Sequence, residues 1–261
     1  MGVFLLESLY LKGKNLWLLY DEVLSWDWKD NDTSEVFSPV PENIVAVLGG
    51  VITAFGQCYG VEYISTLKAC VLPCGNEPIS YRGMNLIGIT ARGRDWKRYA
   101  YEFAHELCHL TIPGAVAQSF RWFEESLCEL ASVFFMYEMA KVWAISPPYP
   151  NWKDYASELS KHSDKVINEK PMQIPSNLTF SKFFEEKMEF LSTHCYERDV
   201  NCLCAKHLLP IFTETPSLWQ DVPTLVKWKQ GTNFMDALIQ WKEEANAKEA
   251  IEKIIRLFYP C

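Results

Sequence analysis

The sequence predicts an α+β protein, with a small mixed β-sheet, two long helices and then a mostly helical C-terminal region. Three observations lead to this fold class. Short apolar runs separated by glycine and proline predict several strands between Val61 and Thr90. Helix-like runs follow at about residues 96–112 and 121–144. Apolar residues three and four positions apart then recur from residue 152 to the C-terminus.

Upstream of the predicted strands, one helix is well marked at both ends. Residues 1–40 suit a short strand or helix and a polar loop. A helix is then predicted over residues 42–59, begun by Pro41 at its first turn and ended by Gly60. Two consecutive glycines, at positions 49 and 50, reduce its intrinsic stability and therefore indicate close packing against another element.

The proline-rich run at residues 146–150 is the best candidate for a domain boundary, because proline does not continue a helix. We therefore predict an N-terminal region at residues 1–146, which contains both long helices, and a helical C-terminal subdomain at residues 147–261. Within the second part, the sequence predicts helices at about 152–167, 180–192, 200–209, 217–227 and 233–258.

Composition and charge narrow the classes of function. The 261-residue chain has a formal net charge of -8, which argues against nucleic acid or an anionic membrane as a main partner. No apolar run is long enough to span a bilayer, and residues 1–10 lack the basic start of a signal peptide. Nine cysteines, an odd number without a regular framework, indicate reduced thiols, so we expect a cytoplasmic protein.

Two histidines four residues apart mark the first long helix as a candidate metal site. Residues 105–109 read His-Glu-Leu-Cys-His, a match to the pattern H-E-x-x-H. At about 100° per residue, His105 and His109 lie one turn apart on one face, so both imidazoles can reach one metal ion. Glu106 is then placed as a proton acceptor, and Zn²⁺ suits such a site. The alternative is two partly buried histidines on an ordinary amphipathic helix.

The second long helix carries two acids that share a face. Glu125 and Glu129 are four residues apart, within a run that reads W-F-E-E-S-L-C-E. An H-E-x-x-H helix followed by such a helix resembles the gluzincin branch of the zinc metallopeptidases, the thermolysin-like and aminopeptidase-like enzymes. The resemblance covers about residues 79–145. This chain differs from the family pattern at Ser126, where the family usually has glycine, and at Glu129, where the family usually has aspartate.

The resemblance implies a zincin-like domain and a ligand set. It makes Glu125 the third zinc ligand, beside His105 and His109. Glu129 is then the acid that orients a histidine ligand, or, in an alternative register, the ligand itself. Glu106 is the general base for a zinc-activated water.

The implied function is that of a zinc metallopeptidase acting on a peptide or protein. In related enzymes an edge strand pairs with the substrate, and residues 81–90 are our candidate for it. The run Gly83-Met84-Asn85 lacks the glutamate that binds a free amine in aminopeptidases, so an endopeptidase is favoured. The alternative is an inactive zincin-like module for zinc binding or protein interaction. No local motif selects the oxyanion donor among Tyr149, Tyr155, His194, Tyr196 and His207.

Overall fold

The computed structural model describes residues 7–10, 16–20, 26–29, 36–169 and 171–260. They form two compact units, one of residues 1–110 and 135–162 and one of residues 111–134 and 163–261. The predicted boundary after residue 146 therefore falls inside the first unit. The reason is the long helix α4 (Arg121–Ile145), which contributes its first half to one unit and its second half to the other. Of residues 1–10, which we do not interpret as a signal peptide, only 7–10 are among the described residues.

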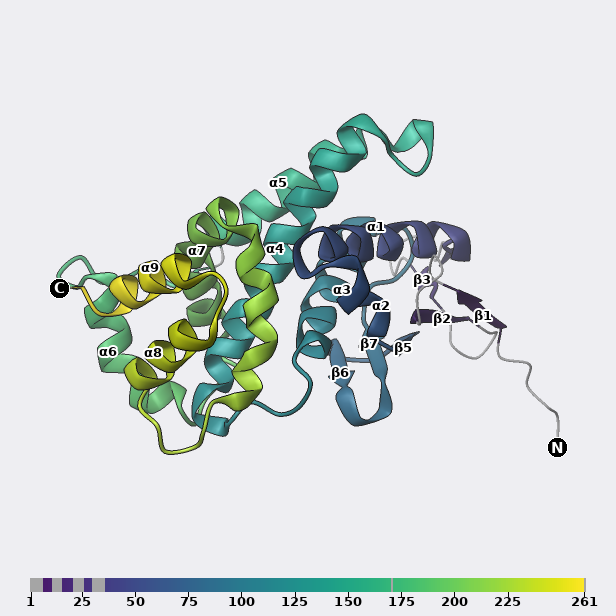
Figure 1. Ribbon diagram of the computed structural model, residues 1–261. Helices are drawn as coiled ribbons and strands as arrows, with labels where there is room; N and C mark the ends of the chain where they lie inside the picture. The colour runs from purple at the N-terminus through teal and green to yellow at the C-terminus, as the bar shows by residue number, and fades with distance from the viewer. Residues whose placement is uncertain (1–6, 11–15, 21–25, 30–35, 170, 261) are drawn as a thin grey trace. The chain divides into compact units, whose positions relative to one another are not determined.

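The α+β class is confirmed. The first unit holds a five-stranded mixed sheet in the order β1-β2-β5-β7-β6, and a separate pair, β3-β4. The bounds of the seven strands are β1 Glu7–Tyr10, β2 Leu16–Tyr20, β3 Trp28–Lys29, β4 Val36–Phe37, β5 Ala69–Pro73, β6 Ile79–Tyr81 and β7 Leu86–Ile89. Strand β5 pairs in parallel with β2 and β7, while β1 and β6 run antiparallel to their neighbours. Figure 1 shows the strands gathered near α1, α2 and α3.

The edge of this sheet differs from the prediction. Residues 81–90 do not form one edge strand, because Arg82–Met84 make a 3₁₀ turn (η1) and Asn85 takes the left-handed conformation at φ 51°. Asparagine tolerates this conformation better than most residues. The chain therefore reverses, β7 lies inside the sheet, and the shorter β6 becomes its edge.

Helix α1 (Pro41–Tyr59) begins and ends as predicted, with Gly60 at its C-cap at φ 92°. Its glycine pair does mark a close approach. A Cβ atom on Gly50 would lie 3.2–3.3 Å from the side chains of Met139 and Trp143 in α4. The predicted strand signal from Val61 was wrong at its start, where α2 (Val61–Thr66) forms instead. Short apolar runs do not distinguish a strand from a helical turn.

Helix α3 (Trp96–Thr111) is anchored to the end of β7 by Glu102, a buried carboxylate. One of its oxygens accepts hydrogen bonds from the backbone N–H groups of Thr90 and Ala91, at 2.6 and 2.9 Å. The other accepts from the Thr90 hydroxyl at 2.6 Å and from Arg98 Nε at 2.7 Å. Because a buried carboxylate requires such partners, this network fixes the helix relative to the sheet.

The second unit is helical. Its elements include α6 Phe180–Leu191, α7 Arg198–Glu214, the 3₁₀ segment η4 Pro216–Lys227, α8 Phe234–Glu244 and α9 Lys248–Phe258. Before them, η3 (Pro150–Trp152) and the start of α5 (Tyr155–Glu169) belong to the first unit. Aromatic rings of Trp122, Phe123, Phe184, Phe234 and Phe258 contact one another in the core of the second unit. Figure 1 shows α8 and α9 side by side, as their contacts also indicate.

The last predicted helix, 233–258, is in fact two helices. The buried carboxylate of Asp221 accepts hydrogen bonds from the backbone N–H groups of Asn246 and Ala247, at 3.0 and 2.9 Å. Ala247 is the N-cap residue of α9, so Asp221 supplies the acceptors that a new helix start requires. The break depends on a residue far away in the sequence, and the local apolar spacing does not reveal it.

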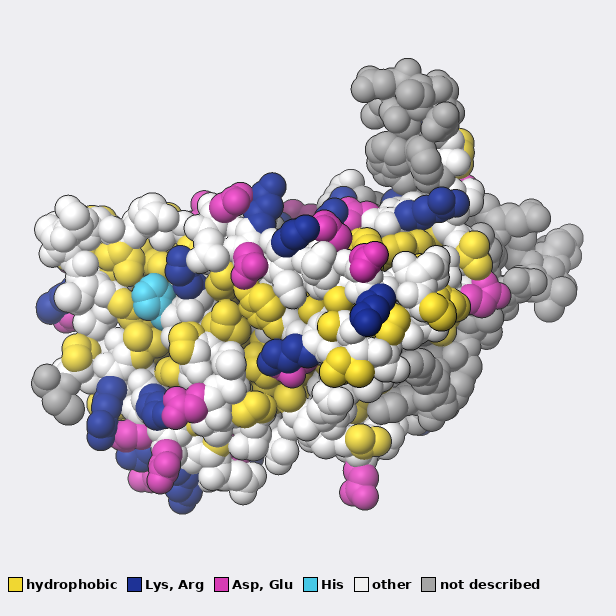
Figure 2. All heavy atoms as spheres, turned by 90° about the horizontal axis from the view of Figure 1, so that it is seen from above, with side chains coloured by type: hydrophobic (Ala, Val, Ile, Leu, Met, Phe, Trp, Pro, Cys, Tyr) yellow, Lys and Arg dark blue, Asp and Glu magenta, His cyan; other side chains and the backbone are white. Residues whose placement is uncertain are grey.

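Charged groups of both signs are interspersed on the face of the molecule in Figure 2. Among the described side chains of that face, neither charge sign forms an extended surface. Among the described helices, none combines the length and apolarity needed to cross a lipid bilayer.

Candidate metal centre

Helix α3 presents both histidines of the H-E-x-x-H pattern on one side. Its buried stripe, which includes Tyr99, Phe103 and Leu107, packs in the core. His105 and His109 lie away from this stripe, and His105 is half-buried. Their ring centroids are 5.2 Å apart, and the ring planes meet at 63°. Two imidazoles in this arrangement can bind the same ion.

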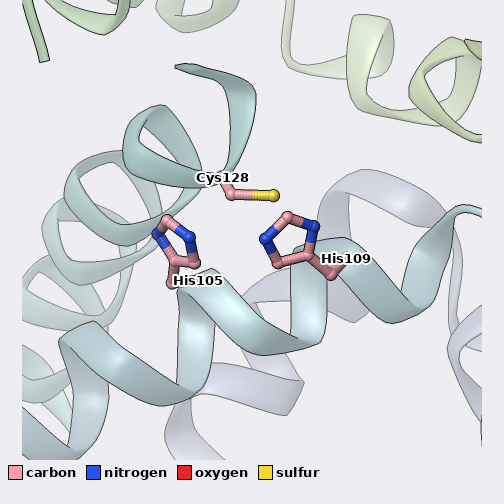
Figure 3. Close-up of side chains that lie close together, drawn as sticks. All are labelled: His105, His109 and Cys128. Atoms are coloured by element: carbon pink, nitrogen blue, oxygen red, sulfur yellow. The ribbon is translucent and has the colours of Figure 1, made fainter. Parts of the chain in front are cut away.

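Cys128 completes a group of three possible ligands. It lies on α4, is fully buried, and offers its sulfur to the same space as the two imidazoles. The ligand atoms of His105, His109 and Cys128 all lie within 4.8 Å of one another. Figure 3 shows both rings rising from α3, with the sulfur beside them. Among the described residues, this is the group of histidine, cysteine and acidic side chains that can hold a metal ion.

Arg82 contacts His109 from the turn after β6. Its Nε donates to the backbone oxygen of His109 at 2.8 Å, and its Nη2 lies 3.3 Å from Nδ1 of the same residue. A guanidinium group can only donate, so Nδ1 is the acceptor in this contact. The other ring nitrogen, Nε2, then carries the hydrogen of the neutral ring, so binding of a metal ion through Nε2 requires that hydrogen to be on Nδ1 instead.

Glu106 is buried, with 5% of its surface exposed. The negative charge of Glu106 acts on the thiol of Cys74, the residue that follows β5. The pKa of this thiol is raised chiefly by burial and then by the charge of Glu102, with a smaller contribution from Glu106. Glu106 and His109 are three residues apart in α3 and therefore share a face of the helix.

The two predicted acids of α4 have different surroundings. Glu129 is buried, and one of its oxygens lies 3.8 Å from Arg198 Nε. Glu125 is half-exposed, and its charge raises the pKa of the Cys195 thiol, which burial raises more strongly. Neither acid belongs to the group around the histidines. The roles assigned to them by resemblance stay predictions.

Cys128 was missed by the sequence reasoning, although a signal existed. It lies three residues after Glu125 and therefore shares that residue's helix face. The sequence reasoning counted Cys128 only among the nine cysteines that form no regular framework. The eight described cysteines, Cys128 among them, are indeed free of disulfide bonds.

All five candidate oxyanion donors make contacts in the structure, and those of Tyr155, His207 and Tyr196 bear on their roles. The Tyr155 hydroxyl accepts a hydrogen bond from the backbone N–H of Lys97 at 3.1 Å, and burial raises its pKa to about 12. His207 packs against Phe180, with ring centroids 4.3 Å apart. The Tyr196 hydroxyl accepts from Arg121 at 2.8 Å. These contacts select none of the five candidates, and no residue is assigned as the donor.

Comparison with models of known protein families found no matching family, and comparisons with characterised proteins and with solved structures found no match either. The chemistry of the site must therefore be inferred from the side chains themselves.

Proposed function

We propose that this protein is a zinc-dependent metallopeptidase of the gluzincin-like type, with a zincin-like site built on α3 and α4. The observation that carries the proposal is the convergence of His105, His109 and a third donor from α4, together with a buried Glu106 directly after His105 in the sequence. Two imidazoles one helix turn apart, with a carboxylate directly after the first, combine a metal site with a base.

The donor set fits zinc. Zinc takes nitrogen, sulfur and carboxylate oxygen ligands, and its catalytic sites have three protein ligands and one open position. Ligand atoms around a tetrahedral zinc ion lie roughly 3.3–3.8 Å apart, as follows from metal–ligand distances of about 2.0–2.3 Å. Since the three donor atoms lie within 4.8 Å of one another, small side-chain rotations bring them to that spacing.

Each residue then has a defined task. His105 and His109 would hold a zinc ion through their imidazole nitrogens. Such an ion would supply an acidified water and a Lewis acid for the carbonyl. Glu106 takes the proton of the attacking water and later passes it to the leaving amine. Its burial strengthens this role, because electrostatic interactions gain strength where water is excluded.

The edge strand β6 supports a peptide as the substrate. Ile79 and Tyr81 on this strand are 37% and 46% exposed, unusually high for large apolar side chains in a sheet. On its other side β6 pairs with β7, and no further strand follows it in the described part of the sheet. Arg82, directly after the strand, contacts His109, so the edge ends beside the site. An extended peptide that pairs with β6 would thus pass close to the histidines.

The test replaces the proposed base. Glu106→Gln keeps the size of the side chain but removes its ability to take a proton, so hydrolysis of peptides should fall by about 10²–10⁴-fold while zinc content stays unchanged. Glu158→Gln, an exposed carboxylate on α5, is the matched control and should retain full activity. Zinc is measured by elemental analysis, and cleavage by mass spectrometry on a peptide library.

Peptides with blocked N-termini belong in that library, because an endopeptidase cleaves them and an aminopeptidase does not. Wild-type protein that binds zinc but cleaves none of the peptides would favour the inactive zinc-binding or interaction module. Equal activity of the wild type and Glu106→Gln would remove Glu106 as the base.

A further inference from the structure

We infer that the third protein ligand of the metal is the thiolate of Cys128, so that the centre has two histidines and one cysteine. This inference rests on the proposed metal site, but it is independent of peptidase activity. It differs from the ligand set that the family resemblance implies, in which the third ligand is the carboxylate of Glu125.

The geometry favours sulfur over the carboxylates. The Cys128 sulfur is already grouped with the two imidazoles within 4.8 Å, whereas Glu125 and Glu129 are outside the group. Figure 3 shows the sulfur directed into the space that the two rings face. Cysteine has a short side chain with one rotatable bond before the sulfur, so its placement on a rigid helix also places the donor.

The surroundings of the competing acids agree with this assignment. Glu129 has Arg198 as a cationic neighbour at 3.8 Å, and this interaction would be lost or weakened if the carboxylate turned to a metal ion. Glu125 is half-exposed, so it keeps much of its hydration where it is. Cys128 is fully buried, and a buried thiol gives up little solvation when it binds a metal.

Zinc binding by this thiol is a proton exchange. The S–H bond breaks, the proton leaves to solvent, and the sulfur lone pair binds the metal. A coordinating thiol is deprotonated by the charge of the ion itself, so no neighbouring base is required. With two neutral imidazoles, one thiolate and Zn²⁺, the centre carries a net charge of +1 and keeps one position open.

Cys108 provides a matched control on the neighbouring helix. It is also fully buried, and it directly precedes His109 in the sequence. Its sulfur lies 3.8 Å from the hydroxyl of Tyr59 in α1, and among the described residues it is not one of the donor atoms grouped with the two imidazoles. A change at Cys108 therefore tests the effect of losing a buried thiol near the site without removing the proposed ligand.

The first experiment is zinc K-edge X-ray absorption on the zinc-loaded full-length wild type, with one equivalent of zinc. Zinc–sulfur bonds are about 2.3 Å long and zinc–nitrogen bonds about 2.0–2.1 Å, so the two shells are resolved. We expect one sulfur in the first shell. A shell of nitrogen and oxygen alone would overturn the inference while leaving the peptidase proposal intact.

The second experiment compares variants. Cys128→Ser should lose the sulfur shell and weaken zinc binding by more than the 10–100-fold typical of residues that only support a ligand, whereas Cys108→Ser should keep both the shell and the affinity. Glu125→Gln should retain the sulfur shell and stoichiometric zinc; loss of zinc in this variant alone would assign the ligand to Glu125. Circular dichroism tests whether each variant folds. If Cys128→Ser does not fold, the X-ray absorption spectrum of the wild type and the zinc content of Glu125→Gln decide between Cys128 and Glu125 as the ligand.

The two proposals fail separately. Zinc with a sulfur ligand but full activity in Glu106→Gln would contradict the peptidase mechanism only. Wild-type protein that binds no zinc would contradict both.

Discussion

Arg82 places a guanidinium group against an imidazole that should hold a metal ion. When a neutral histidine binds a metal through Nε2, its hydrogen is on Nδ1, and that N–H usually donates to a carboxylate or carbonyl. Here Nδ1 faces Arg82 Nη2, a donor and a cation, at 3.3 Å. A metal ion that binds Nε2 must therefore break this contact and lie near the positive charge of Arg82. We therefore expect Arg82 to lower the affinity of the site for a metal ion.

Replacing Arg82 by methionine removes the donor and the charge but keeps a long apolar chain. We expect the affinity for zinc to rise by about 10-fold, the lower end of the range for residues that contact a metal ligand. Competition with a chromophoric chelator measures this change. Arg94→Met, at an exposed arginine on the same unit, is the control and should leave the affinity unchanged. Weaker binding in Arg82→Met would instead make Arg82 a support for His109 through its bond to the backbone oxygen.

At the scale of a single element, α3 can hold the two histidines in place only if the helix itself is fixed to the sheet. Glu102, one turn before Glu106, accepts four hydrogen bonds from the end of β7 and from Arg98. Glutamine at this position has one oxygen, and its NH₂ group would face donors whichever way the amide is turned. Buried donors without an acceptor are costly.

Glu102→Gln should therefore lower the free energy of unfolding by about 2–3 kcal/mol, measured by urea denaturation. Zinc content should persist at low denaturant, since no ligand is changed. Glu158→Gln removes an exposed ion pair to Lys161 and should leave the midpoint where it is, because such pairs contribute little in water. A Glu102→Gln protein as stable as the wild type would show that the helix is held by its apolar stripe alone.

For the whole molecule, a metal that binds only the folded chain must raise its stability. At a free zinc concentration 100 times the dissociation constant, the gain is about 2.7 kcal/mol. For a chain of this size that corresponds to a rise in the unfolding midpoint of roughly 5–10 °C. Differential scanning calorimetry with and without chelator measures it.

His105→Ala is the control for the calorimetric experiment, because it removes a ligand that both the sequence and the structure indicate. Its midpoint should not respond to zinc. A zinc-dependent shift of equal size in this variant would mean that the metal binds elsewhere, for example at surface acids, and the site on α3 would lose its support.

Features that depend on neighbouring residues were predictable from the sequence. The start of α1 at Pro41, its end before Gly60 and the extents of α3 and α4 follow from apolar spacing and from residues that begin or stop helices. The meeting of His105 and His109 follows too, because a spacing of four residues closes one helical turn. These relationships are contained within a single element.

Features that depend on distant residues were decided only by the tertiary structure. The break before α9 requires Asp221, and the edge position of β6 depends on which strand pairs with β7. The grouping of Cys128 with the histidines, and the contact of Arg82 with His109, join elements whose mutual placement no local spacing encodes. The sequence alone determined which helix carries the candidate metal site, because the helical repeat that brings the two histidines together depends only on residues close in the chain. The tertiary structure decided which side chains complete that site, because packing brings distant residues together.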